Sequence, residues 1–523
     1  MSEFTENAMR GASGADKRYV IGLDIGTTSL CATAVDTRNG SAARTIVRPN
    51  HAAIAGEAPD ERLQDPDRIA DELLALLEEW RDLRPETAAI GISAQMHGIL
   101  YVDGHGRAVS PLYTWQDGRG ERQAPSGGTA TIEAGAAAGT IEAGAAAGVR
   151  RASSGEPTYR EQLETLSGYP VPSGYGLLTH DVLRRNGCVP EAAAKLCTVG
   201  DYVAMRLTDR PAPLMDATQA AGLGLFDLRS RSFDAAAVAR AGIDATLLPA
   251  LARPAGTRSG ATPAGALVGT TPEGIPVAVA IGDNQASYLG TVPALTGSLL
   301  FNVGTGAQLS LYTPEPVEPA GGLELRPFPD GGWLLAGASL GGGKSYALLA
   351  GFYREIAETL GGGEGSVPSE RLYDAMNRWA LTALDEGHPL PRVDAAFFGT
   401  RVDPARAGEI ASLTSATLTP QALTAGLLAG VADELAAFAA QLPAELLAGV
   451  RRHVGAGNGL RRNPALRRLL EQRIGAPLEL ADAREEAAFG AAVHAAVCAG
   501  IFTDYDEALT RMGGARLTEG EIV

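Results

Sequence analysis

The first segment whose residue types could do chemistry runs from Asp24 to Ser29, with the sequence DIGTTS. Glycine lets a backbone approach a phosphate closely, and threonine and serine hydroxyls add donors to the backbone N–H groups. A carboxylate repels phosphate, but Asp24 could hold Mg²⁺ against it through water, because Mg²⁺ prefers few carboxylates and several waters. The alternative is a polar-capped β-hairpin with Asp24 solvated. A similar turn at Gly304-Thr305-Gly306 favours the phosphate interpretation, because two such turns can clamp a polyphosphate from opposite sides.

A second carboxylate, Asp283, follows an apolar stretch at 276–281 that predicts a strand. Active-site carboxylates are commonly placed at strand ends, where a rigid sheet positions them. Asp283 could accept a proton from a substrate hydroxyl as a general base, a role worth about 10²–10⁴ in rate. The alternative is an Asx turn or a helix N-cap.

A third group of polar residues is divided between QMHG at 95–98 and TWQDGR at 114–119. Sugars present hydroxyls on their edges, which Gln, His, Asp and Arg side chains can satisfy, and C–H patches on their faces, which Trp can cover. Taken alone, His97 is more often a hydrogen-bonded core histidine, and Trp115 a packing residue. The density of polar groups around one tryptophan favours a ligand site.

The segment Ala338–Ser345, ASLGGGKS, matches a relaxed P-loop pattern between an apolar strand and a helical stretch. It lacks the first glycine of that motif, no strand–helix–strand series surrounds it, and no Asp-ended apolar strand follows closely to hold Mg²⁺. We therefore expect this glycine run to bring a helix close to a nucleotide cleft rather than to form a P-loop.

The elements around these segments predict an α/β fold. Apolar stretches at 19–25 and 30–35 predict two strands joined by the Gly-Thr turn. Asp65-Pro66 predicts a helix start, with Asp as N-cap and Pro at the first position, and apolar residues recur at helical spacing as far as Trp80. Strands at 88–93 and 99–103 follow. The pattern indicates a sheet that is not purely parallel.

The second half of the chain repeats the opening pattern. Strands predicted at 298–303 and 308–312 flank the turn at 304–306, which indicates a second domain related to the first. The elements expected after it are a helix over 420–440, a strand near Val454, a glycine-rich loop at 455–459, a helix from Pro464, a strand at 478–480 and a last helix at 485–499.

Composition excludes several classes of protein. The 523 residues include 61 acidic and 44 basic side chains, a formal net charge of −17, which argues against general nucleic-acid binding. No run approaches 18 uninterrupted apolar residues, so we expect no membrane span. The four cysteines form no C-x-x-C pair, which argues against a disulfide framework and suits a reducing, cytoplasmic location.

Two segments are expected to lie outside the folded domains. Residues 1–18 are polar and small, without an apolar signal region, and predict a disordered leader. Within 124–156, the nonapeptide TIEAGAAAG occurs at 131–139 and again at 140–148. A repeat without large side chains buries little surface, so we interpret this segment as a surface insertion.

In this order, the motifs resemble those of the FGGY carbohydrate kinases, a branch of the actin/hexokinase-like superfamily. The resemblance covers residues 19 to about 500. Within the family, the chain is most similar to the sedoheptulokinase subgroup, through SGYG at 173–176, GDYVA at 200–204, PLMDATQAAGLGLFDL at 213–228, GDNQAS at 282–287, FFGTR at 397–401 and LRRNPAL at 460–466. The Gly304–Gly306 turn departs from that subgroup, since xylulokinases and glycerol kinases carry Gly-Thr-Gly there and animal sedoheptulokinases differ.

The resemblance implies two ribonuclease-H-like domains with mixed sheets flanking a nucleotide cleft: residues 19–285, mainly for sugar, and 286–523, mainly for ATP. It implies Asp24 as the Mg²⁺ ligand through water and Asp283 as the catalytic base. The phosphates and nucleotide would be held by Gly26, Thr27, Thr28, Ser29, Gly304, Thr305, Gly457 and Asn458. The sugar would be held by Gln95, Met96, His97, Trp115, Asp117 and Asn284.

The implied activity is an ATP-dependent kinase acting on the primary hydroxyl of a ketose, with sedoheptulose as the leading substrate. Xylulokinase or another ketose or polyol kinase activity is the first alternative. A non-catalytic sugar- or nucleotide-sensing protein on the same fold is the second, and retention of both Asp24 and Asp283 argues against it. The expected partners are the sugar and ATP, without nucleic acid or membrane, and a homodimer is left open.

Overall fold

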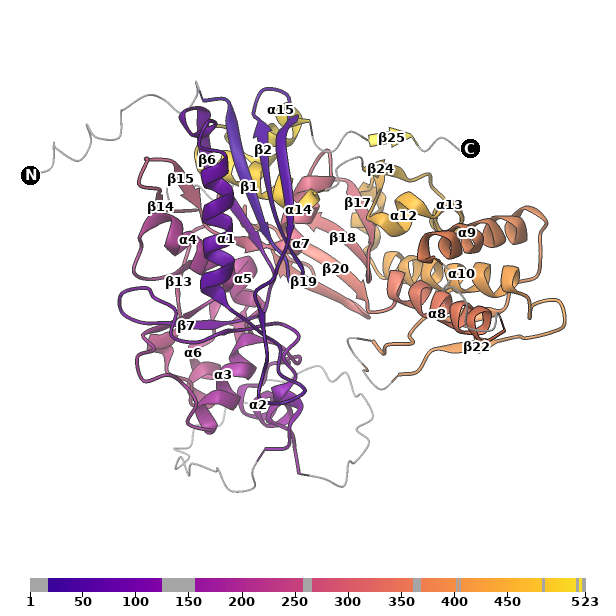
Figure 1. Cartoon of the computed structure of the whole chain (residues 1–523), viewed down its shortest axis with the longest axis horizontal. Helices are drawn as coiled ribbons and strands as arrows, with labels where there is room; N and C mark the ends of the chain where they lie inside the picture. The colour runs from indigo at the N-terminus through magenta and orange to yellow at the C-terminus, as the bar shows by residue number, and fades with distance from the viewer. Residues whose placement is uncertain are drawn as a thin grey trace, which may run out of the picture.

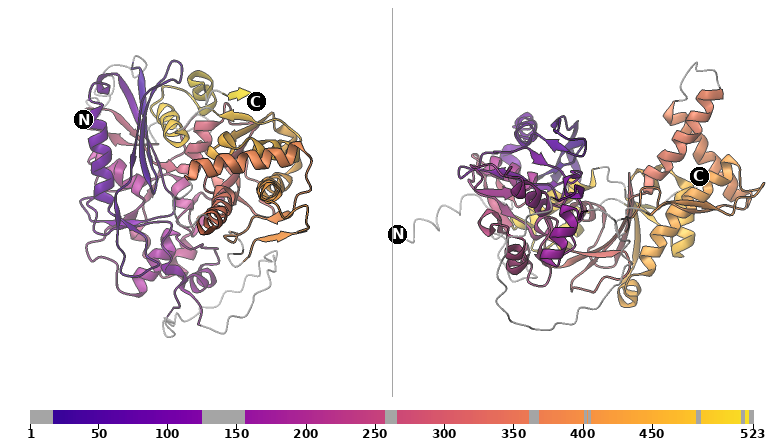
Figure 2. Two further views of the ribbon diagram at one scale, coloured as in Figure 1. Left: turned by 45° about the vertical axis from the view of Figure 1, so that its right-hand side comes forward. Right: turned by 90° about the horizontal axis from the view of Figure 1, so that it is seen from below.

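The computed structural model describes residues 17–124, 156–256, 266–360, 368–400, 403, 406–481, 485–513 and 517–519. The predicted leader, apart from residues 17 and 18, and the predicted insertion, apart from its two ends, lie outside these ranges. The chain forms two lobes: indigo to magenta in Figure 1 for the N-terminal half, and orange for most of the C-terminal half. Figure 2 shows the same two lobes from the side and from below.

The first lobe is built on a seven-stranded mixed sheet in the order β14-β15-β6-β1-β2-β3, with β16 also pairing with β6. Strand β1 pairs antiparallel with β2 and parallel with β6. Every residue of β1 except Asp24 is buried, as expected for a strand that is covered on both faces. The strands are β1 (Tyr19–Ile25), β2 (Ser29–Asp36), β3 (Ala42–Pro49), β6 (Thr87–Ala94), β14 (Leu267–Thr270), β15 (Pro276–Ala278) and β16 (Ile281–Gly282).

The second lobe repeats this arrangement in the sheet β19-β20-β18-β17-β23-β24-β25. Strand β17 pairs antiparallel with β18 and parallel with β23, as β1 does with β2 and β6. The predicted relation between the two halves is thus present in strand order and direction. The strands are β17 (Ser298–Val303), β18 (Ala307–Thr313), β19 (Leu323–Pro327), β20 (Trp333–Ser339), β23 (Arg452–Ala456), β24 (Glu479–Ala481) and β25 (Leu517–Glu519).

Helix α14 (Glu486–Cys498), near the end of the chain, packs on the first sheet rather than the second, against β1, β6 and helix α7 (Asp283–Thr291). The approach is backbone to backbone. A Cβ at Gly22 would lie 1.8 Å from the Ala488 carbonyl oxygen, and one at Gly290 would lie 1.8 Å from the Glu486 carbonyl oxygen. Glycine at positions 22 and 290 is therefore required by this close packing. In Figure 1 this yellow helix lies beside the indigo strands.

The remaining helices pack around the sheets and against one another, as α2 does against α3 and α6. Asp65 caps the predicted helix α1 by accepting bonds from the N–H groups of Asp67 and Arg68, as expected. The helices are α1 (Pro66–Glu79), α2 (Tyr159–Ser167), α3 (Gly176–Arg185), α4 (Val199–Thr208), α5 (Ala217–Ala221), α6 (Ala235–Arg240), α8 (Gly342–Leu360), α9 (Ser369–Asp385), α10 (Pro420–Ala440), α11 (Ala444–Gly449), α12 (Asn458–Arg462), α13 (Pro464–Ile474) and α15 (Tyr505–Met512).

Short strands form small sheets outside the two main ones. They are β4 (Ala53–Ile54), β5 (Leu63–Gln64) and β8 (Leu112–Tyr113); β7 (Leu100–Val102) and β9 (Lys195–Cys197); β10 (Leu214–Met215) and β13 (Ala250–Leu251); β11 (Phe226–Asp227) and β12 (Ser232–Phe233); and β21 (Arg392–Asp394) and β22 (Glu409–Ala411). The strand predicted at 99–103 is β7, which joins one of these small sheets instead of continuing the main one.

One helix in the described part of the chain, α10, is long and apolar enough to cross a membrane. Two thirds of its apolar window is buried inside the protein, where it packs against α9 and α13. We interpret α10 as a core helix of the second lobe.

Other predictions differ from the structure in detail. The strand predicted at 276–281 is divided into β15 and β16, and the glycine-rich loop expected at 455–459 is shorter, because Gly455 lies in β23 and α12 begins at Asn458. The domain boundary at 285/286 remains a prediction.

Candidate active site

The Asp24–Ser29 segment forms a tight turn between two antiparallel strands of the first sheet. The Gly26 N–H donates to the Ser29 carbonyl at 2.9 Å, and Asn50 Nδ2 donates to the Gly26 carbonyl at 2.9 Å. Thr28 is exposed at the tip, and Gly26, Thr27 and Ser29 are half-buried. The turn therefore presents backbone and hydroxyl groups at the end of a rigid sheet, the arrangement predicted for a phosphate contact.

Asp24 lies at the end of β1 in strongly negative surroundings. Burial raises the pKa of Asp24 to about 7, a bond from Ser93 Oγ at 2.7 Å opposes that rise, and the charges of Asp283, Glu485 and Glu486 add to it. Carboxylates gathered in this way favour a cation between them. Within the described ranges, no three His, Cys, Asp or Glu side chains form a metal cage. Asp24 alone, with phosphate oxygens and water, fits the ligand set of Mg²⁺.

Asp283 is the first residue of α7, directly after β16, and Gly282 occupies the N-cap position. Asp283 is therefore not the helix N-cap, although its Oδ1 accepts the Asn284 N–H at 2.8 Å. Strands β1 and β16 both pair with β6, where Asp24 and Ile281 each face Ser93, so the two carboxylates lie at the same end of the sheet. Asn284 Nδ2 lies 3.6 Å from Met96 Sδ, which joins the start of α7 to the end of β6.

His97 adopts a strained backbone conformation. Its φ is +75°, and the Gly98 N–H donates to the Met96 carbonyl at 3.0 Å, which closes a γ-turn centred on His97. Strain of this kind persists only where the surroundings hold it, and it clusters at functional sites. Here His97 Nδ1 donates to the Gly222 carbonyl at 2.7 Å, and its ring stacks on Tyr175 with centroids 4.5 Å apart.

Gln95, Thr27 and Trp115 meet through side-chain hydrogen bonds. Trp115 Nε1 donates to Thr27 Oγ1 at 2.9 Å, and Thr27 Oγ1 donates to Gln95 Oε1 at 3.0 Å. The indole remains 44% exposed, so one face is available to a ligand. The structure thus brings residues predicted for the sugar and for the phosphate into one network.

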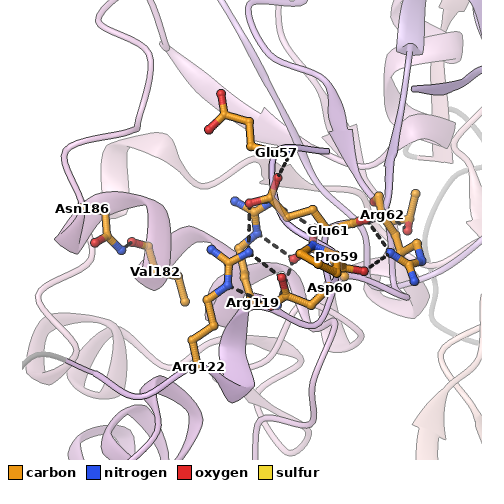
Figure 3. Close-up of polar contacts among 11 residues, drawn as sticks. Glu57, Pro59, Asp60, Glu61, Arg62, Arg119, Arg122, Val182 and Asn186 are labelled. Atoms are coloured by element: carbon orange, nitrogen blue, oxygen red, sulfur yellow. Dashed lines mark hydrogen bonds and ion pairs between the residues drawn. The ribbon is translucent and has the colours of Figure 1, made fainter. Parts of the chain in front are cut away.

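Asp117 differs from the other predicted sugar residues because its carboxylate is buried and engaged within the protein. Its oxygens accept Arg119 Nε at 2.6 Å and Arg119 Nη2 at 3.0 Å, and Oδ2 also accepts the Arg62 N–H at 3.2 Å. Figure 3 shows the neighbouring loop, in which Arg122 binds Asp60 and Glu61. Contact of Asp117 with a sugar remains a prediction, and its observed bonds secure this loop.

A cavity of about 630 Å³ adjoins the first turn, and the same loop forms one wall. Polar residues that line it include Thr27, Thr28, Gln64, Thr114 and Gln116. This volume lies within the range of small-molecule sites.

The second turn, Gly304–Gly306, contacts the segment that resembles a P-loop. The Gly343 N–H donates to the Gly304 carbonyl at 3.0 Å, and the Lys344 N–H donates to the Thr305 carbonyl at 2.8 Å. Lys344 Nζ lies over the Phe398 ring, 4.0 Å from its centroid. The glycine run thus brings the start of α8 against the second turn, as expected, and its lysine faces an aromatic ring.

Gly457 and Asn458 lie beside the same turn. Gly457 has φ +82°, and a Cβ there would lie 2.4 Å from the Val303 carbonyl, the residue before Gly304. Arg461, one turn into α12, forms an ion pair with Glu486, which acts on Asp24. The ion pair places Glu486 between α12, beside the second turn, and Asp24, whose pKa its charge raises.

Three residues near the site were missed by the sequence analysis as functional candidates: Gln64, Tyr175 and Arg326. Tyr175 lies in the SGYG motif, but nothing local indicates that it stacks on His97. Arg326 is buried and forms an ion pair with Glu324 at 2.6 Å. The charges of Asp283 and Tyr175 help to raise its pKa. Among the described residues, its Nη1 has no hydrogen-bond partner. Gln64 carries no motif signal.

The chain is similar to known proteins over most of its length. The model of the FGGY family of carbohydrate kinases, N-terminal domain, matches residues 19–126 and 157–290. Sedoheptulokinase from Mus musculus is 28% identical over 518 residues, covering 92% of this chain and 97% of that protein. Xylulose kinase from Streptomyces coelicolor is 27% identical over 507 residues, covering 95% of this chain and 90% of that protein.

Solved structures share the fold. Xylulose kinase from Rhodospirillum rubrum aligns with a TM-score of 0.72 and 21% identity, covering 96% of this chain and 93% of that one. Plasmodium falciparum glycerol kinase with ADP aligns with a TM-score of 0.70 and 16% identity, covering 97% and 94%. The family match, the full-length relatives and the two related sheets lead to one conclusion: the chain belongs to the FGGY family of carbohydrate kinases and is a sugar kinase, a phosphotransferase with an alcohol group as acceptor.

Proposed function

We propose that the protein transfers the γ-phosphoryl group of ATP to the primary hydroxyl of a ketose, and that sedoheptulose, giving sedoheptulose 7-phosphate, is its substrate. The observation that carries the proposal is the position of Asp24 and Asp283 at the ends of β1 and β16, two strands that both pair with β6. The curated sedoheptulokinase relative, matched along nearly its whole length, supports the choice of sugar.

In the proposed reaction, Asp283 accepts the proton of the sugar hydroxyl as that oxygen attacks the γ-phosphorus in line. The Gly26–Ser29 turn binds the transferred phosphate, Gly304 and Thr305 bind the adjoining phosphates, and Gly457 and Asn458 border the nucleoside. Asp24 would hold Mg²⁺ through water, and the ion would supply charge stabilisation to the phosphates. Met96, His97, Trp115 and Asn284 form the sugar side, where the strained His97 turn and the exposed indole face give fixed contacts.

A xylulose kinase activity is the second candidate, because the Streptomyces xylulose kinase is nearly as similar to this chain as the sedoheptulokinase. A coupled ADP-release assay decides between them. It compares kcat/KM for sedoheptulose, xylulose, ribulose, fructose, ribitol and glycerol, with Asp283→Asn as the inactive control. A highest value for sedoheptulose supports the proposal, and a highest value for another sugar replaces it. Nucleotide binding without turnover on any of these sugars would indicate a sensing protein.

A further inference from the structure

Gln64 completes a closed ring of hydrogen bonds with residues on both sides of the proposed site. Its Oε1 accepts Gln95 Nε2 at 2.9 Å, and its Nε2 donates to the Thr27 carbonyl at 2.8 Å. Thr27 Oγ1 donates to Gln95 Oε1, which closes a ring of Thr27, Gln95 and Gln64. Trp115 is attached to this ring through its bond to Thr27 Oγ1. Gln64 and Gln95 are 3% and 4% exposed, so water does not compete for these bonds.

The ring joins elements that belong to different sheets. Gln64 lies on β5, which pairs with β4 and with β8, the strand directly before Trp115. Thr27 and Gln95 follow β1 and β6 of the main sheet. Since each amide group has both its oxygen and its nitrogen engaged, the orientation of each is fixed by the other. A shift of the Trp115 indole is therefore transmitted through Thr27 to the backbone of the phosphate turn.

We propose that Gln64 is a positioning residue that couples the Trp115 side of the sugar site to the phosphate turn at Thr27. This inference rests on the proposed function, because it takes Trp115 to contact the sugar and Thr27 the phosphate. Gln64 itself touches neither ligand in this scheme. It holds the Thr27 carbonyl and the Gln95 amide, so that a sugar stacked on Trp115 stabilises the turn conformation that receives the phosphoryl group.

The test combines kinetics with hydrogen exchange on the full chain, using Gln64→Leu, Gln64→Glu, Trp115→Phe and the double variant Gln64→Leu/Trp115→Phe. Gln64→Glu keeps the acceptor for Gln95 and places an oxygen against the Thr27 carbonyl, so it breaks one bond of the ring. Gln441→Leu is the matched control, because Gln441 likewise bonds to a backbone group: at the end of α10 in the second lobe, its Oε1 accepts the Gly322 N–H at 2.8 Å.

We expect Gln64→Leu to raise the sugar KM about 10-fold, and to increase ATP hydrolysis without sugar relative to sugar phosphorylation. Amide exchange in residues 26–29 should become faster in Gln64→Leu and in Trp115→Phe. Because both changes remove a hydrogen bond to the same residue, Thr27, the double variant should exchange little faster than either single variant. Gln441→Leu should match the wild type in every measurement.

The proposal is overturned if the two single changes have strictly additive effects on amide exchange at residues 26–29. It is also overturned if Gln64→Leu exchanges at the wild-type rate in these residues. If Gln64→Leu does not fold, Gln64→Glu gives the same comparison. The exchange measurement needs no turnover. If exchange is non-additive in the double variant but the protein phosphorylates no sugar in the assay, the proposed function is contradicted, while the role of the ring is still supported.

Discussion

The two strand–turn–strand units of the molecule have the same topology but different supports. The first turn, at 26–29, receives one backbone bond, from the Asn50 N–H to the Thr28 carbonyl, and is also held by side chains of Asn50, Gln64 and Trp115, which come from three separate segments. The second turn, at 304–306, is held by backbone bonds from Gly343 and Lys344, in one following segment. A side-chain network can respond to the shape of a ligand, whereas a backbone contact fixes only the main chain. We therefore expect changes in the first unit to affect mainly the sugar, and changes in the second unit to affect mainly ATP.

The largest effect is expected for a change at Asp283, which tests whether the first unit supplies the group that accepts the proton. Asp283→Asn removes the proposed base without changing side-chain volume, so kcat should fall by at least about 10²-fold. The KM for ATP should stay near the wild-type value, because the second unit is unchanged. Steady-state kinetics with ADP-release detection measure both. Wild-type kcat in this variant would remove Asp283 from the mechanism.

The next effect concerns the charge that the first unit carries. The pKa of Asp24 is raised to about 7, which means that the folded protein favours the protonated side chain. The contribution of Asp24 to the free energy of unfolding is therefore fully present below its ordinary pKa of 3.8 and is lost as the pH rises through about 7. Asp24→Asn, neutral at every pH, should therefore be more stable than the wild type at pH 8 by roughly 1–3 kcal/mol, and similar to it at pH 4.

Urea unfolding without Mg²⁺ measures this difference, and activity should be lost in the same variant. Equal stability of the two proteins at pH 8 would show that burial and the neighbouring carboxylates do not raise the pKa of Asp24.

A third change tests the backbone support of the second turn. A Cβ at Gly342 would lie 2.3 Å from the Gly306 carbonyl carbon, and Gly342 has φ +31°. Gly342→Ala should displace the start of α8 from the turn and raise the KM for ATP about 10-fold, an effect worth ~1.4 kcal/mol, with little change in sugar KM.

The matched control is Gly351→Ala in the same helix, where a Cβ meets nothing within 4 Å. This variant should bind ATP normally and be slightly stabilised. An equal rise in sugar KM in Gly342→Ala would mean that the two units are not specialised.

The smallest expected effect separates strain from recognition in the first unit. His97→Gly relieves the positive φ but removes the ring that stacks on Tyr175 and the bond to Gly222. Relief of about 1 kcal/mol of strain should offset part of the lost packing, so His97→Gly should be more stable than His97→Ala in thermal unfolding. Both should bind sugar weakly. Equal melting temperatures for the two variants would contradict strain at His97.

The sequence predicts the repeated unit well, because strand–turn–strand patterns and the cap at Asp65 are local. It also places Asp24 and Asp283 at strand ends, which is where the structure has them. Gln64 and Arg326 could not be found in this way: their roles depend on β5 meeting the first turn and on β19 lying beside α7, contacts between segments far apart in the chain. Asp117 is the opposite case. Its motif predicts a ligand contact, which stays a prediction, but nothing in the motif indicates that the carboxylate binds Arg119.

The position of α14 has a consequence for biosynthesis. The first sheet receives one of its covering layers from residues 486–498, so a nascent chain that has emerged only as far as α7 exposes apolar strand surface around Gly22 and Gly91. The N-terminal lobe cannot mature on the ribosome before almost all of the polypeptide has been translated. Premature termination anywhere before residue 486 should yield an aggregation-prone fragment rather than a separately folded lobe.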